Sequence, residues 1–314
     1  MERAPAALLR AIGLPAGAGG RGPSDLAVLG GSVLLLLGGE DSAASLLTAV
    51  MAGRASTSES RVLVGTKKLP VHTREASRYL GYVPEDPGCP PEVTPRAHLS
   101  LVAASMGMGG KRADKAISEL LDWCLLFEDK DTPWAALDPE RKGSLALASA
   151  LLDNPQVIVI AREIPASLLD RLQDLKSLGK AILMRSGSVS GIPPAADRIG
   201  ICDGDGVAAV VRRSDLEAVC RRMGTIEVGF YPALPRETME QLPGVSHLRS
   251  TGSGYVFGHR DTSSALVHLA GLARANARSI AGLRVLPPEP SALARQLGPA
   301  TEDQRTLFAE GEGP

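Results

Sequence analysis

The residues best placed for chemistry lie where a short apolar segment meets a helix. Residues 32–37 (SVLLLL) are followed by residues 38–45 (GGEDSAAS), and an apolar helical pattern follows them. A strand, a glycine loop and a helix N-terminus can bind phosphate. Backbone N–H groups close around the anion, a lysine reaches the terminal phosphates, and a Ser or Thr hydroxyl binds magnesium. Gly38 and the Ser45 hydroxyl match this pattern.

The same loop lacks most of what phosphate binding needs. Ala43 stands at the position of the second glycine, and Ala44 stands at that of the lysine. Glu40 and Asp41 place two carboxylates where an anion would be held. Taken alone, these residues favour an ordinary strand-to-helix turn capped by Asp41 or Ser42.

Strands and helices alternate around this loop. Apolar runs without alternation predict buried parallel strands, and periodic apolar positions predict helices. The expected strands are 32–37, 61–64, 79–83, 157–160 and 181–184, with a closing hairpin at 198–202 and 207–211. The expected helices are 42–52, 95–106, 111–127, 139–152 and 167–178. This order predicts an α/β fold with a mostly parallel sheet flanked by helices.

The composition changes near Met223. From there the pattern predicts the order β-α-β-β-α-β, which is typical of a small α+β, ferredoxin-like domain. The Gly-, Ala- and Pro-rich start and the charged end predict loosely held segments. We therefore expect a flexible segment at 1–25, a main domain at 26–222, a small domain at 223–290 and a mobile tail at 291–314.

Six segments, in order, resemble the motifs of the ATP-binding-cassette (ABC) ATPases, which are P-loop NTPases. They span about residues 30 to 215. The segments are LLLLGGEDSAASLLTAVMAG (phosphate loop), RYLGYVPEDP (glutamine loop), LDPERKGSLALASALL (signature helix), NPQVIVIAREI (Walker B), GKAILMRSGS (switch strand) and ADRIGICD. The C-terminal region resembles the small domain that follows the ATPase in drug- and polysaccharide-type exporters, through Pro243–Val245, Gly252–Tyr255 and Glu289–Ser291.

The departures from the family pattern fall on its catalytic positions. They are Ala44 for the lysine, Glu85 for the glutamine, residues 138–141 (DPER) for the signature, Ala161 for the magnesium Asp, Arg162 for the catalytic Glu and Gly187 for the switch His. The first aromatic residue is Tyr79, so the usual adenine-stacking residue is missing and we expect a truncated antiparallel subdomain.

The resemblance therefore implies a degenerate nucleotide site, that of a pseudoATPase. No residue is assigned a catalytic or metal-binding role, and no cofactor is expected beyond ATP and Mg²⁺ bound weakly, if at all. The candidate nucleotide contacts are Gly38, Gly39, Ser42, Ser45 and Glu85.

Two features leave alternatives open. Arg162 ends a buried strand, where an unpaired charge is costly. It either pairs with Glu163 or Asp41 in place of the lost metal site, or contacts a phosphate directly. The Pro-rich loop that contains Glu85 (residues 84–95) is either a solvated turn or a retained docking surface for a membrane subunit.

The composition of the chain argues against several classes of function. The formal net charge is −1 and aromatics make up 3% of the chain, which argues against nucleic acid as a partner. The four cysteines form no CxxC pair, so neither a zinc site nor a disulfide framework is expected. The N-terminus does not resemble a signal peptide, and no apolar run is long enough to span a bilayer. A bacterial, cytoplasmic protein held at the inner face of the membrane by a partner fits these features.

Three functions remain. The first is a non-catalytic exporter subunit that docks on a membrane permease or pairs with an active ABC ATPase; a homodimer is also possible. The second is a nucleotide-binding or nucleotide-gated subunit with residual activity. The third is a soluble scaffold no longer linked to transport.

Overall fold

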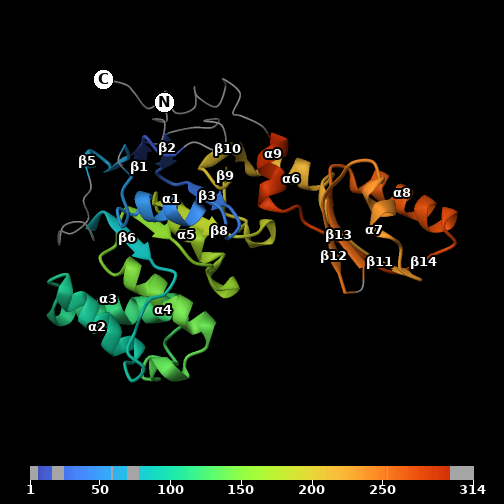
Figure 1. Cartoon of the computed structure of the whole chain (residues 1–314). Helices are drawn as coiled ribbons and strands as arrows, with labels where there is room; N and C mark the ends of the chain where they lie inside the picture. The colour runs from blue at the N-terminus through green and yellow to red at the C-terminus, as the bar shows by residue number, and fades with distance from the viewer. Residues whose placement is uncertain (1–5, 16–24, 58, 69–77, 253, 298–314) are drawn as a thin grey trace.

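A six-stranded, mostly parallel sheet forms the centre of the molecule (Figure 1). This computed structural model describes residues 6–15, 25–57, 59–68, 78–252 and 254–297. The strand order is β10-β9-β3-β8-β7-β6, and every neighbouring pair is parallel except the β9–β10 hairpin. The bounds are β3 Val33–Leu37, β6 Leu80–Val83, β7 Val157–Ile160, β8 Ala181–Ser186, β9 Arg198–Cys202 and β10 Val207–Arg212. The predicted α/β class with a mostly parallel sheet is confirmed.

Strand β3 is buried along its whole length because both faces of the sheet are covered. Leu34 and Leu36 pack on the side of α1 (Ala44–Met51). Leu35 packs on the opposite side, against the helices α4 (Pro139–Leu151), α5 (Arg171–Ser177) and α6 (Arg213–Cys220). The loop after β3 therefore starts from a rigid core position.

A second sheet, antiparallel and four-stranded, covers α1. Its order is β2-β1-β4-β5, with β1 Ala7–Ile12, β2 Leu26–Leu29, β4 Arg61–Val64 and β5 Lys67–Lys68. The expected flexible segment over 1–25 is therefore wrong for residues 7–12, and the antiparallel subdomain is not truncated. The strand β1 forms because it pairs with β2 on one side and β4 on the other, and because Leu9 and Ala11 enter the core.

Three helices form a separate lobe beside the central sheet (Figure 1). They are α2 (Pro95–Ser105), α3 (Gly110–Trp123) and α4, which share a core built around Leu99, Ile117 and Leu145. Short 3-10 helices lie at Trp134–Ala136, Ala166–Leu168 and Val189–Gly191.

The C-terminal unit has an antiparallel sheet of order β12-β13-β11-β14. Its elements follow the predicted β-α-β-β-α-β order, and Ile226, Val228, Phe257 and Leu269 lie in its core. The bounds are β11 Gly224–Tyr231, α7 Arg236–Glu240, β12 Val245–Thr251, β13 Gly254–His259, α8 Thr262–Ala275 and β14 Ser279–Leu286.

The chain then returns to the central unit as α9 (Pro290–Leu297), beside α6 (Figure 1). Leu293 is fully buried in the core that also holds Ile199 and Ile201 of β9. The expectation of a mobile tail from residue 291 is therefore wrong for residues 291–297, and residues 298–314 lie outside those described. Within the described ranges, no helix has the length and apolarity needed to cross a bilayer.

Candidate functional site

The loop between β3 and α1 is closed on itself. The Ser42 backbone N–H donates to the Gly39 carbonyl at 3.1 Å, and the Ser42 hydroxyl donates to the same oxygen at 2.7 Å. The Ala44 N–H donates to the Ser42 hydroxyl at 3.4 Å. Ser42 thus ties the two sides of the loop together.

The neighbouring residues are bonded to other elements. The Ala43 N–H donates to the Asp203 carbonyl in the β9–β10 hairpin at 2.7 Å. The Gly38 N–H donates to the Ser186 carbonyl of β8 at 3.0 Å. A phosphate-binding loop presents its N–H groups to the anion. Here the N–H groups of residues 42, 43 and 44 are already bonded within the protein.

The two glycines of the loop differ in their surroundings. A Cβ atom at Gly38 would lie 2.1 Å from the Ser42 Oγ, so only glycine fits beneath the closed loop. A Cβ atom at Gly39 would meet nothing within 4 Å. Both glycines were candidate nucleotide contacts. The close approach of Ser42 accounts for a glycine at position 38 without any ligand.

Ser45 and Glu85, the other candidate contacts, meet in one cluster. The Ser45 hydroxyl donates to Glu85 Oε1 at 3.0 Å. The Arg185 guanidinium joins both residues: Nη1 lies 2.7 Å from Ser45 Oγ, and Nη2 lies 2.8 Å from Glu85 Oε1. Its Nε donates to the Ala161 carbonyl at 3.3 Å. We name Ser45, Glu85, Arg185 and the Ala161 carbonyl the arginine cluster.

Arg185 was missed by the sequence reading. A charged residue within the apolar strand AILMRS was the available signal. What could not be read from sequence was the direction of the side chain, which reaches across from β8 to α1 and to the end of β6. Tyr82 on β6 lies near the cluster, and burial raises the pKa of its hydroxyl.

The other altered positions gather around the loop but carry no reactive group. Ala44 is fully buried and Ala161 is 5% exposed. Gly187 lies beside the loop, since a Cβ atom there would be 4.0 Å from the Gly38 carbonyl oxygen. The fold therefore brings together Ala44, Ala161 and Gly187, the positions where the family resemblance led us to expect a lysine, a metal-binding carboxylate and a histidine.

The Arg162 side chain lies against α4. Its guanidinium carbon lies 3.8 Å from where a Cβ atom on Gly143 of α4 would be. Among the described residues it forms no ion pair with Glu163 or Asp41, so the expected structural pairing is wrong. Its place against α4 also gives no support to a phosphate contact in this loop.

The N-terminus of α4 is capped by its own carboxylate. Asp138 Oδ1 accepts from the Arg141 N–H at 2.7 Å, and Pro139 occupies the first turn. Glu140 accepts a hydrogen bond from the Ser167 hydroxyl at 2.7 Å. The N-terminus of α4 thus carries one negative charge at its N-cap and one in its first turn, where an external anion would otherwise be favoured.

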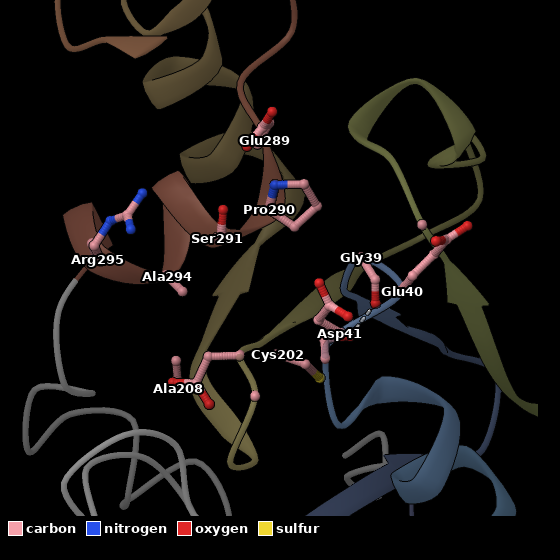
Figure 2. Close-up of a pocket in the computed structure, with 14 residues that line it drawn as sticks. Gly39, Glu40, Asp41, Cys202, Ala208, Glu289, Pro290, Ser291, Ala294 and Arg295 are labelled. Carbon is pink, nitrogen blue, oxygen red and sulfur yellow. Dashed lines mark hydrogen bonds between the residues drawn. The ribbon is translucent and has the colours of Figure 1, made fainter. Parts of the chain in front are cut away.

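A cavity of about 820 Å³ separates the loop from α9 (Figure 2). The acidic residues Glu40, Asp41, Asp203 and Glu289 line it, with Arg295 as a cation. Such a charge balance disfavours a polyphosphate. Cys202 also lines the cavity, and burial, followed by the nearby Asp203 charge, raises the pKa of its thiol to about 12. This thiol is not a nucleophile at neutral pH.

No group of three or more His, Cys, Asp or Glu side chains suited to a metal ion occurs in the part of the chain described. The residues present therefore fit a Mg²⁺–nucleotide complex poorly. The amides of residues 42, 43 and 44 are bonded within the protein, Ala161 offers no carboxylate, and the Arg185 guanidinium contacts the Ser45 hydroxyl.

No family model matches the chain. Its sequence is 26% identical to the Nod factor export ATP-binding protein I of Rhizobium etli over 265 residues, which is 82% of this chain and 80% of that protein. The protein of the same name from Sinorhizobium fredii is 26% identical over 67% of this chain; the alignment spans 63% of its length, less than two thirds.

Solved structures show the same fold. An ATP-binding subunit of an ABC transporter superposes with a TM-score of 0.55 at 20% identity, covering 67% of this chain and 92% of that one. The cbiO1 protein from Clostridium perfringens, part of an ABC transporter complex, superposes with a TM-score of 0.57 at 19% identity, covering 68% and 91%. The chain therefore has the ABC ATPase fold, and its sequence is similar to that of exporter-type ATP-binding proteins.

Proposed function

We propose that this chain is a non-hydrolysing ABC-type subunit of an exporter, which docks on a membrane permease or pairs with an active ATPase. The observation that carries the proposal is the closed loop. The amides of residues 42, 43 and 44 are bonded to the Gly39 carbonyl, the Asp203 carbonyl and the Ser42 hydroxyl, at the place where phosphates would be held.

Phosphoryl transfer relies on positioning and on stabilising negative charge. In this site the lysine position is the buried Ala44, and the metal-binding position is Ala161. The catalytic carboxylate is replaced by Arg162, whose guanidinium lies against α4. Each such loss typically lowers the rate by orders of magnitude, so together they leave no group to polarise a water molecule.

Pairing with an active ATPase would not restore a normal site. In the resembling family, each site is built from the phosphate loop of one subunit and the signature segment of the other. Here that segment carries Asp138 and Glu140, and Asp138 already caps the helix N-terminus. Two carboxylates near a partner's γ-phosphate would oppose its charge, so we propose that both composite sites of a heterodimer are impaired.

A docking role is supported by the Pro-rich loop that contains Glu85 (residues 84–95). Its far end is held by backbone bonds: the N–H groups of Trp134 and Ala135 donate to the carbonyls of Val93 and Pro91, both at 2.9 Å. A loop fixed in this way suits a docking surface better than a solvated turn. The location we propose is the inner face of the membrane, through this partner. We also propose that the C-terminal unit has the ferredoxin-like fold, since its element order and strand order agree with it.

The first test measures phosphate release from ATP by the purified chain. We expect none above background, and any residual signal should be the same in Ser45→Ala. Release that falls in Ser45→Ala would contradict the proposal, because it would originate in this site.

The second test addresses the partner. The tagged chain is recovered from detergent-solubilised membranes of the native host, and co-purifying proteins are identified by mass spectrometry. Co-purification of an exporter permease supports the proposal. Recovery of the chain only from the soluble fraction, without a membrane protein, would instead favour a scaffold unconnected with transport.

A further inference from the structure

The arginine cluster joins three elements through one cation. The Arg185 guanidinium leaves β8, bonds the Ser45 hydroxyl at the start of α1, and pairs with the Glu85 carboxylate after β6. Its third bond is to the Ala161 carbonyl, just after β7. The bonds to Ser45 and Glu85 are 2.7 and 2.8 Å long, as charge-assisted bonds are.

These partners coincide with a metal site of the fold. In phosphate-loop NTPases the loop Ser or Thr and an Asp after the Walker B strand hold the magnesium ion. Ser45 stands at the first position and Ala161 at the second. A guanidinium therefore contacts the positions from which a divalent ion would be held, and Glu85 adds a carboxylate that balances its charge.

The cluster differs from an ordinary surface ion pair. Arg213 and Glu217 are four residues apart on one helix, as are Arg236 and Glu240. Arg185 instead follows Met184 in a buried strand. Its bonds to Ser45, Glu85 and Ala161 span 140, 100 and 24 positions of the sequence. Its side chain is 24% exposed. The strand β8 fixes the direction of the Arg185 side chain, and its guanidinium bonds to residues of three other elements or their ends.

We propose that Arg185 is a built-in cation that replaces the divalent metal of this site, so that Ser45 and Glu85 do not bind Mg²⁺ while it is present. The inference deepens the proposed function, on which it rests. It also implies that the ends of β6, β7 and β8 are tied to α1 without nucleotide or metal, whereas a metal-dependent site is assembled only when its ligand arrives.

The test compares the wild type with Arg185→Ser in thermal melting, with and without millimolar Mn²⁺. Serine is small and polar, so it removes the charge and the reach of the guanidinium. We expect the wild type to melt at the same temperature in both conditions. Arg185→Ser should melt lower without metal and recover part of the loss in Mn²⁺, because Ser45 and Glu85 become free to bind it. Arg185→Ser/Glu85→Gln should lose this recovery.

Arg213→Ser is the matched control, since it removes a similarly half-buried arginine, bonded to Glu217 and to the Pro193 carbonyl, away from the loop. Its melting temperature should not respond to Mn²⁺. If Arg185→Ser melts as the wild type does, or shows no response to metal, the proposal is wrong. A second measurement needs no folded variant at position 185: electron paramagnetic resonance of the wild type with Mn²⁺. A spectrum of protein-bound Mn²⁺ that weakens in Glu85→Gln would overturn the proposal. A spectrum of free Mn²⁺ alone in the wild type would support it.

The outcomes separate this inference from the proposed function. Mn²⁺ binding by the wild type at Glu85 would refute the role of Arg185 while leaving permease docking and the absence of hydrolysis untouched. Phosphate release that depends on Ser45 but needs no divalent metal would refute the proposed function and leave Arg185 as the cation of the site.

Discussion

Gly38→Ala tests the closed loop directly. A Cβ atom on residue 38 would lie 2.1 Å from Ser42 Oγ and 2.8 Å from Ser42 Cβ, well inside the usual contact distance of about 3.5–4 Å. The φ angle of Gly38 is not in the left-handed region, so the backbone itself accepts alanine. The cost therefore comes mainly from the contact with Ser42, to which Ala44 Cβ at 3.0 Å adds a tight contact.

The magnitude follows from what Ser42 must give up. To make room, its hydroxyl leaves the Gly39 carbonyl and the Ala44 N–H. Two neutral hydrogen bonds contribute about 1–3 kcal/mol. Removing a glycine restricts the unfolded chain and returns about 0.4–1 kcal/mol. We expect a net loss of about 1–2 kcal/mol in the free energy of unfolding, which lowers the melting temperature by about 2–8 °C in a domain of this size.

The assay is chemical and thermal denaturation of a double-mutant cycle with Ser42→Gly. In the Ser42→Gly background only the 3.0 Å contact with Ala44 Cβ remains, so Gly38→Ala should cost much less than in the wild type. Gly39→Ala is the control, because a Cβ atom there meets nothing within 4 Å. An equal cost of Gly38→Ala in both backgrounds, or no cost in the wild type, would refute the closed loop.

Three further predictions concern the rest of the structure. Leu293→Ala should destabilise the protein by about 2–5 kcal/mol, because this fully buried side chain anchors α9; Leu178→Ala, at a 74% exposed position, should change stability by less than about 0.5 kcal/mol. A smaller loss at Leu293 in denaturation would contradict the docking of α9. Burial raises the pKa of the Cys124 and Cys202 thiols to about 12, so alkylation near pH 8 should label them only after denaturation; mass spectrometry of labelled peptides checks this. Burial lowers the pKa of His98, so the unfolded chain binds its proton first, at about 6.5, and stability falls as the pH drops through that value. His98→Asn should flatten the loss measured between about pH 7.5 and 5.5, and an unchanged slope would exclude His98 as its cause.

The central sheet was predictable because each strand has a recognisable local sequence pattern. VLLLL, VIVI and AILM are continuous apolar runs between turn residues, and they became β3, β7 and most of β8. Helix α4 was likewise predictable, since Asp138 and Pro139 mark its start. These signals lie within the element itself, so no knowledge of tertiary contacts was needed.

Elements stabilised by distant partners were not predictable. The strand β1 lies in a Gly- and Ala-rich region and exists because β2 and β4 flank it. The helix α9 is short, and Leu293 is buried by a strand about ninety residues earlier in the chain. Helix α6 was not predicted either. Leu216 is its one buried residue.

The candidate site was predictable in position but not in its contacts. Motif order placed Ser45 and Glu85 at one end of the sheet, and they do bond to each other. The closure of the loop by Ser42 and the reach of Arg185 depend on side-chain directions that residue spacing does not define. The same is true of Arg162, where both expected partners were wrong because the guanidinium points toward α4.

The measurement that tests the central claim most directly is calorimetric titration of the purified chain with ATP, with and without Mg²⁺. A loop closed by Ser42, with Arg185 at the metal position, predicts no heat of binding at millimolar ATP and no effect of Mg²⁺. Saturable, Mg²⁺-dependent binding that is lost in Ser45→Ala would contradict the account, since it would require the loop amides and the Ser45 hydroxyl to be free for a metal–nucleotide complex.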